Sequence, residues 1–399
     1  MKRFFALIAI LFTACQPSTS TVTPPSIPHV TLVPSFTESA VPQPIAIETA
    51  METVTPTSIA TVPASTVELD GAEVPPGFSL IKFADLYRPT GFAFDEQGRL
   101  LVTSQDGNVY ILHDENQDSR ADSRSTFATG YYFPLGVAVH SASGDVYVSY
   151  QGAITVLKDT NGDDRADEER ILVDDLPFDK HQNDNLEFGP DGWLYIGVGS
   201  TCDACDDPDP RSASILRFNV ETGEREVFAT GMRNPFDIAF HPETGELFAT
   251  DNGRDDLGME APFEELNHIL PGSDYGYPDC WNEQDQPGCE STIPPIAFFE
   301  PHSSANGVDI YNWETFPAEY HGNAFVTIFG SWLKADVQTG IQRVLLTPNG
   351  ETYTAETSWF VRFPAGVMPL PLLFGPDDAL YVGDYVNDAI YRISYGLPR

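Results

Sequence analysis

The sequence predicts an all-β protein whose globular part is a six-bladed β-propeller. One strand–turn–strand pattern recurs six times, its apolar residues alternate within each copy, and its turns carry similar residues. The copies begin near residues 91, 136, 185, 237, 307 and 370. A single hairpin leaves its apolar face open to water, whereas a closed ring of such units buries it. A pair of packed sheets, the main alternative, does not predict one hairpin repeated with a similar turn.

Each copy is expected to form two strands joined by a tight turn. Examples are GFAFDEQGRLLVTS (91–104), NLEFGPDGWLYIGVGS (185–200) and LPLLFGPDDALYVGDY (370–385). The alternation is typical of half-buried strands, and PDG, ETGE and PDD favour tight hairpin turns. A further strand follows most copies, such as NVYIL (108–112). One ring occupies all of residues 72–399, so we expect a single propeller domain.

The N-terminal segment predicts a secretory signal followed by a linker. Residues 1–15, MKRFFALIAILFTAC, have a basic head and an apolar run too short for a permanent membrane span. The ending resembles the lipobox of bacterial lipoproteins and predicts a lipidated Cys15; an ordinary cleaved signal peptide is the alternative. Residues 16–71 are rich in Thr, Ser and Pro and predict a disordered linker. We therefore expect an exported protein, cell-surface or periplasmic, lipid-anchored at Cys15.

The charge balance excludes some partners. The chain has 21 Lys and Arg against 59 Asp and Glu, a formal net charge of -38. Nucleic-acid binding needs clustered basic residues, so we expect no nucleic-acid partner. The same balance argues against binding an anionic membrane surface. Membrane contact is expected only through the N-terminal lipid.

Four cysteines remain after Cys15, namely Cys202, Cys205, Cys280 and Cys289. An even number in an exported protein predicts two disulfides, most simply between sequence neighbours. A zinc or redox site is the alternative for the CDAC segment. No second CxxC accompanies it, and acidic neighbours would raise the pKa of a thiol there, so structural disulfides are favoured.

Two acidic loops share one register. They contain Asp114, Asn116, Asp118 and Asp122 in the first copy, and Asp159, Asn161, Asp163 and Asp167 in the second. Oxygens at alternate loop positions can converge on Ca²⁺. Neither loop is an EF-hand, because the sixth position is not Gly and the twelfth is not Glu. Weak structural Ca²⁺ sites and solvated acidic turns explain the pattern equally well.

The longest loops should mark the functional face, because propellers place chemistry where loops from several blades converge. These loops are 174–184, 200–213 and 253–306. His181 lies in the first of them, where a neutral imidazole suits a general base near pH 7. A capping or surface histidine is the alternative. Asp179 or Asp184 could orient the ring.

Arg233 and Asn234 lie in GMRNPFDIAF, at the entry to a predicted strand. An Arg in so acidic a chain is expected to have a defined anionic partner, either a structural carboxylate or a bound anion. The following stretch, residues 251–281, combines acids, amides and aromatic rings. It could form a further Ca²⁺ site or stack on a flat ligand or a sugar.

Three segments resemble the glucose/sorbosone dehydrogenases. They are HQNDNLEFGPDGWLYIGVGS (181–200), GMRNPFDIAFHPETGELFATDNGRDDLG (231–258) and EELNHILPGSDYGYP (264–278). FVTIFGSW (325–332) and the C-terminal DDALYVGDYVNDAIYRISY are also similar. The family consists of six-bladed propellers that use pyrroloquinoline quinone (PQQ) with Ca²⁺. The resemblance implies oxidation of a sugar or related polyol or aldehyde by hydride transfer to the quinone; it leaves the electron acceptor unknown.

The resemblance also implies residue roles. His181 would take the hydroxyl proton, and Arg233 would polarise the quinone carbonyl with help from Ca²⁺. Asn234 would hold the cofactor, and Lys334 would contact one of its carboxylates. Glu265 and Tyr275 match positions associated with Ca²⁺ in the aldose dehydrogenase branch.

One position departs from the family pattern. Met368 stands where the family often carries an Arg that binds the cofactor carboxylates, and Arg343 or Arg362 could compensate. Two other functions stay open on this fold. One is a metal-dependent propeller lactonase, and the other is a non-catalytic, tethered extracellular binding module.

Overall fold

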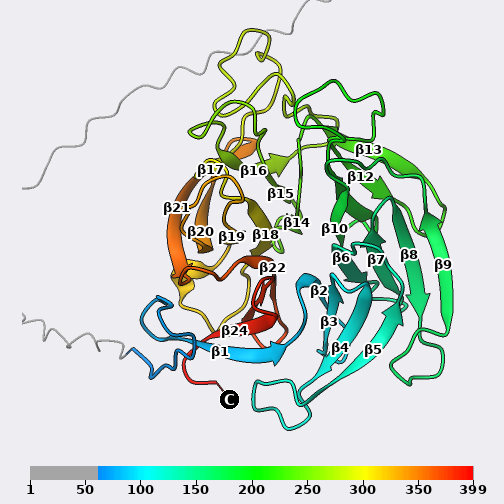
Figure 1. Ribbon diagram of the computed structural model, residues 1–399, viewed down its shortest axis with the longest axis vertical. Coiled ribbons are helices and arrows are strands. Elements are labelled where there is room, and N and C mark those ends of the chain that lie inside the picture. The colour runs from blue at the N-terminus through cyan, green and yellow to red at the C-terminus, as the bar shows by residue number, and fades with distance from the viewer. Residues whose placement is uncertain (1–61, 399) are drawn as a thin grey trace, which may run out of the picture. The chain divides into compact units, whose positions relative to one another are not determined.

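The computed structural model describes residues 62–398, which form a ring of six antiparallel four-stranded sheets (Figure 1). The predicted six-bladed all-β propeller is confirmed. The first three blades are β2 (Pro89–Phe94), β3 (Leu100–Ser104), β4 (Asn108–His113), β5 (Ser123–Thr129); β6 (Gly136–Val139), β7 (Val146–Tyr150), β8 (Ala153–Lys158), β9 (Glu168–Val173); and β10 (Asn183–Phe188), β11 (Leu194–Val198), β12 (Ser214–Phe218), β13 (Arg225–Thr230). The other three are β14 (Ile238–Phe240), β15 (Leu247–Asp251), β16 (Glu264–Ile269), β17 (Ala297–Phe299); β18 (Ala305–Ile310), β19 (Ala324–Ile328), β20 (Gly340–Asn349), β21 (Thr352–Arg362); and β22 (Pro369–Phe374), β23 (Leu380–Asp384), β24 (Ala389–Tyr395), β1 (Phe78–Asp85). A 3-10 turn, η1 (Ala318–Tyr320), precedes β19.

The first strand closes the ring. β1 pairs antiparallel with β24, with Phe78 opposite Tyr395, so the first described strand is the outer strand of the last blade. The innermost strands β2, β6, β10, β14, β18 and β22 lie next to one another around the centre (Figure 1). Each of them is the first strand of its blade hairpin, so the loops that enter them gather at one end of the central channel.

The hydrophobic core lies between neighbouring blades. Six clusters of buried side chains occur in the described region, one for each contact between adjacent sheets. The second strand of each hairpin is therefore covered on both faces, and β3, β11, β15, β19 and β23 are buried along their whole length. Half-buried alternation was expected for these strands; packing against two neighbouring blades explains the difference.

The segment before β1 packs against the propeller. Val67 pairs with Leu80, Glu73 pairs with Arg362, and the Leu69 side chain packs on the cluster around Phe78. Contacts with the propeller therefore begin before residue 72. The signal peptide, Cys15 and most of the predicted linker lie outside the described residues. Among residues 62–398, no helix is long and apolar enough to span a membrane.

Candidate functional site

A cleft of about 550 Å³ lies at the channel end where the inner strands begin. Its lining comes from the loops that enter β6, β10, β14 and β18 and from those that follow β15, β19 and β23. Residues on β10, β16, β18 and β22 themselves complete it. Five of the six blades thus contribute to one hollow. His181, Arg233 and Asn234, three residues predicted from the sequence, all line it.

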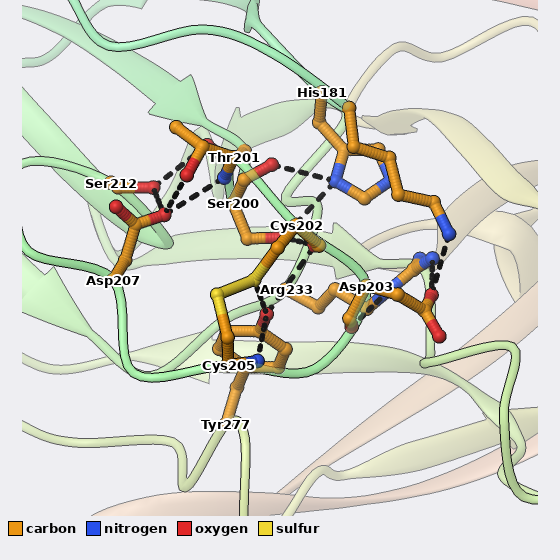
Figure 2. Close-up of a disulfide and its surroundings, with 12 residues drawn as sticks. His181, Ser200, Thr201, Cys202, Asp203, Cys205, Asp207, Ser212, Arg233 and Tyr277 are labelled. Carbon is orange, nitrogen blue, oxygen red and sulfur yellow. Dashed lines mark hydrogen bonds and ion pairs between the residues drawn. A yellow bond between two sulfur atoms is a disulfide. The ribbon is translucent and has the colours of Figure 1, made fainter.

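His181 is held in one orientation by the Ser200 backbone. Its Nδ1 lies 2.9 Å from the Ser200 carbonyl oxygen, to which it donates, so Nε2 is the acceptor nitrogen of the neutral ring (Figure 2). Burial, then the charge of Arg233, lowers the pKa of His181 to about 4. The imidazole is therefore neutral at pH 7. Ser200, and neither Asp179 nor Asp184, fixes the ring.

The absence of a side chain at Gly199 makes room for His181. A Cβ on Gly199 would lie 2.5 Å from the His181 Cβ and 2.7 Å from the Asn234 Oδ1. We predict that Gly199→Ala displaces both side chains, costs about 1–3 kcal/mol of stability, and impairs any function that needs His181. Thermal unfolding measures the first effect. An unchanged melting temperature would show that the loop absorbs the methyl group without strain.

Arg233 is buried, with 5% of its area exposed, and each nitrogen of its guanidinium donates to an acceptor of the protein. Nη2 donates to Asp203 Oδ1 at 2.6 Å (Figure 2). It also donates to Asp255 Oδ2 at 3.0 Å. Nε and Nη1 donate to the backbone carbonyls of Asp203 and Asn252, each at 3.1 Å. The anionic partner expected for Arg233 is thus a pair of carboxylates of the protein itself.

Lys180 joins the same two carboxylates. Its Nζ lies 2.7 Å from Asp203 Oδ1 and 2.9 Å from Asp255 Oδ2. Burial acts to raise the pKa of Asp203, but the hydrogen bonds from Lys180 and Arg233 outweigh it and hold that pKa far below its usual range. Two cations and two anions therefore form one network at the cleft.

Asp251 shapes the turn that carries Arg233 and Asn234. Its carboxylate accepts hydrogen bonds from the backbone N–H of Arg233 at 3.0 Å and of Asn234 at 2.6 Å. Burial raises the pKa of Asp251 to about 7. The buried carboxyl group of Asp251 thus satisfies two backbone N–H groups that have no partner in a β-sheet.

Two predicted ligands lie outside the cleft lining. Lys334 is ion-paired with Glu300 at 2.7 Å. Tyr275 is buried in the core, where its hydroxyl donates to the His268 carbonyl at 2.5 Å and accepts from the Leu270 N–H at 2.8 Å. Their assigned roles stay predictions, and neither side chain lines the cleft in this structure.

The register of β16 places Glu264, rather than Glu265, in the cleft lining. Neighbouring strand residues point to opposite faces. Glu264 is 3% exposed and accepts from the Gly253 N–H at 2.7 Å and the Ser304 N–H at 3.3 Å. Burial raises its pKa to about 8. The sequence carried no signal that separates the two, because the apolar residues of EELNHI do not alternate with period 2 and so mark no inward face.

The Arg residues proposed to compensate for Met368 bind elsewhere. Arg362 lies 3.3 Å from Glu73, and the Arg343 Nε donates to Asn323 at 2.8 Å. Neither lines the cleft, and Met368 lies in a separate hollow. Lys180 and Arg233 are the Lys and Arg side chains among the described residues that line the cleft.

Two buried acceptor atoms in the cleft lack partners within the described chain. They are Asp184 Oδ2 and Asn252 Oδ1, on residues that are 2% and 8% exposed. Burial, then the charges of Asp237 and Asp251, raises the pKa of Asp184 well above its usual value. An unpaired buried acceptor is costly, and a bound cation or a retained proton would satisfy it.

Both predicted disulfides are present. Cys202 is bonded to Cys205, and Cys280 is bonded to Cys289. The first closes the loop that carries Asp203 (Figure 2). Asp207 anchors the same loop by accepting from the Thr201 N–H at 2.8 Å.

The duplicated acidic loops have similar conformations. Asp114 accepts from the backbone N–H of Ser119, and Asp159 accepts from that of Asp164, each at 2.9 Å. Within residues 62–398, no group of three or more His, Cys, Asp or Glu side chains is arranged to hold a metal. Ca²⁺ binding by these loops stays a prediction. A melting temperature that Ca²⁺ raises and a chelator lowers would support it; no change would favour solvated turns.

The sequence has a family assignment over most of its length. The family described as a domain of unknown function, DUF7133, matches residues 65–393. The chain belongs to the DUF7133 family. An uncharacterized protein of Borreliella burgdorferi is 27% identical over 220 residues, 51% of this chain and 57% of the relative. The HIPL1 protein of Arabidopsis thaliana is 23% identical over 43% of this chain and 32% of its own length. The matches thus span only about half and a third of these relatives.

Solved structures share the fold of this DUF7133 chain at low identity. A Trichoderma reesei carbohydrate-active enzyme of family AA12 has a TM-score of 0.71 at 18% identity, over 83% of this chain and 99% of its own. The PQQ domain of a pyranose dehydrogenase from Coprinopsis cinerea has 0.69 at 18%, over 83% and 99%. The PQQ-bound aldose sugar dehydrogenase of Streptomyces coelicolor has 0.61 at 19%, over 81% and 99%. The fold implied by the sequence resemblance is therefore confirmed.

Proposed function

We propose that this DUF7133 protein is a quinoprotein oxidoreductase that oxidises a sugar or related polyol or aldehyde in the cleft. The observation that carries the proposal is His181, a neutral imidazole whose Nδ1 is fixed by Ser200 and whose Nε2 is left as acceptor in the cleft that Arg233 also lines. The names of the solved structures with this fold support sugar oxidation. The two disulfides support an extracytoplasmic location.

The cleft suits PQQ, a flat tricarboxylate, in its donor set and in the aromatic rings of its lining. Phe133, Phe329 and Tyr385 give it aromatic walls for a flat ring. The sequence resemblance gave Arg233 to the quinone carbonyl; because Arg233 and Lys180 share one charged network, we assign both to the cofactor carboxylates instead. Asn234 adds an amide. The unpartnered Asp184 and Asn252 oxygens are hard donors of the kind that Ca²⁺ prefers. When bound, PQQ supplies the electrophilic carbon that accepts hydride.

The residues of the chain supply binding and proton transfer. The His181 Nε2 takes the proton of the substrate hydroxyl while the Ser200 carbonyl holds the Nδ1 proton in place. Because the pKa of His181 is lowered to about 4, the base is neutral throughout the physiological range. Protonation of His181 is therefore expected to lower turnover as the pH drops through about 4.

The test is reconstitution with PQQ and Ca²⁺, followed by dye reduction with a panel of aldoses and polyols. We expect substrate-dependent reduction above that of free PQQ. Cofactor that binds tightly but supports no turnover with any sugar would contradict the proposal. That outcome would favour the non-catalytic binding module, for which the four hydrogen bonds from Arg233 to the protein's own acceptors are the supporting observation.

A further inference from the structure

Lys180, Arg233, Asp203 and Asp255 form a charged network at the cleft in which each carboxylate contacts both cations. Asp203 Oδ1 contacts both Lys180 and Arg233, at 2.7 Å and 2.6 Å. Asp255 Oδ2 also contacts both, at 2.9 Å and 3.0 Å. Each cation is therefore shared between the same two carboxylates, at a point where the cations line a cavity. The carboxylates of Asp203 and Asp255 therefore occupy the places where the carboxylates of a bound ligand would pair with Lys180 and Arg233.

The two carboxylates remain able to leave. The side chains of Asp203 and Asp255 are 27% and 38% exposed, whereas Arg233 is 5% exposed and fixed from its backbone by Asp251. The Asp203 backbone is held by the Cys202–Cys205 disulfide, so its carboxylate would move by side-chain rotation alone (Figure 2). Arg233 thus forms the fixed part of the network, whereas the side chains of Lys180, Asp203 and Asp255 are all partly exposed. The Asp203 carboxylate also accepts from the Asp255 N–H at 3.1 Å, a bond that a ligand carboxylate in its place would take over.

The network is electrically balanced. While Asp203 and Asp255 stay in place, the two positive charges are neutralised and one N–H of the Arg233 Nη1 is left over. An anionic ligand entering this cleft therefore finds no free cation. Exchange of one carboxylate for another conserves the ion pairs, so its free-energy cost is small compared with breaking them.

We propose that Lys180 and Arg233 form a subsite for ligand carboxylates, and that Asp203 and Asp255 occupy it as internal anions until such a ligand replaces them. The inference rests on the proposed function in one respect, since PQQ is the carboxylate ligand expected there. It also makes Lys180, which the sequence did not single out, a second cation for ligand carboxylates in this cleft.

The experiment measures the dissociation constants of citrate and of PQQ by calorimetry, for the full chain and four variants. Asp203→Asn and Asp255→Asn each remove one internal charge and should tighten citrate binding at least about tenfold. Lys180→Gln should weaken it by a similar factor. The matched control is Asp256→Asn, in the same loop as Asp255, whose carboxylate pairs with Arg254 at 2.6 Å. It should leave citrate binding unchanged.

The outcomes separate the subsite from the proposed enzyme. Tighter citrate and PQQ binding in both Asp variants, with the control unchanged, supports both. Tighter citrate binding with no PQQ binding by any variant keeps the subsite and removes the quinone assignment. Citrate affinity that is unchanged or weaker in Asp203→Asn and Asp255→Asn, or that changes equally in Asp256→Asn, overturns the subsite.

Discussion

His181→Asn is expected to lower turnover of the reconstituted enzyme by about 10²–10⁴-fold, the usual contribution of a general base. The dissociation constant of PQQ should stay within a factor of about three, because Arg233 and Lys180 rather than His181 carry the charges that bind it. Steady-state dye reduction measures the first quantity, and calorimetric titration measures the second.

The matched control is His302→Asn in the same cleft. His302 is also buried, but its Nε2 lies 2.8 Å from the Gly258 carbonyl, which leaves that nitrogen engaged. Its replacement should change turnover far less than His181→Asn. Equal losses in the two variants, or undiminished turnover in His181→Asn, would remove His181 as the base.

Metal-free protein is expected to be more stable at pH 5 than at pH 8. Burial raises the pKa of Asp237 and Asp251 to about 7 and that of Asp309 to about 6. Between pH 4 and pH 7 these groups hold protons in the folded state that the unfolded chain has released, so stability falls as pH rises. A carboxyl whose pKa is higher by one in the folded chain than in the unfolded chain changes the free energy of unfolding by about 1.4 kcal/mol across this range. Three such groups predict a melting temperature at least about 5 °C higher at pH 5.

Asp203 has the opposite effect on the pH dependence of stability, because Lys180 and Arg233 hold its pKa low. Its contribution is present above the unfolded pKa near 4 and is lost as the pH falls further. Stability should therefore be highest near pH 4, and it should fall from there towards pH 8. Acid also stabilises the protein by reducing its net charge of -38, and Asp237→Asn separates that effect from the titration of buried carboxyls. The variant should reduce the change in melting temperature between pH 5 and pH 8. A higher melting temperature at pH 8, or an unchanged slope in Asp237→Asn, would contradict this account.

The propeller was predictable because each blade repeats one hairpin whose turn residues are local signals. Burial of β11 or β23 on both faces was not, because it depends on blades that are distant in sequence. The disulfides were predictable since each joins near neighbours. Both the blade hairpins and the disulfides could be predicted because the residues that determine them are close together in the sequence.

The site was predictable only in part. His181, Arg233 and Asn234 stood out as polar residues in loops entering blades. Lys180, Asp203 and Asp255 come from three different loops, and only the closed ring brings their charges within hydrogen-bond distance. Glu264 was missed for a different reason: its neighbour matched a family position, and sequence alone does not fix which face of β16 looks into the cleft.

The central claim, that the cleft beside His181 is the cofactor and substrate site, is tested most directly by a crystal structure of the protein grown with Ca²⁺ and PQQ. The account predicts quinone density in the cleft, with its carboxylates on Lys180 and Arg233 and Asp203 or Asp255 turned away. A cavity of equal volume, about 550 Å³, lies elsewhere and is lined by Asp377 and Arg392. Quinone density in that second cavity, with the His181 cleft empty, would contradict the account.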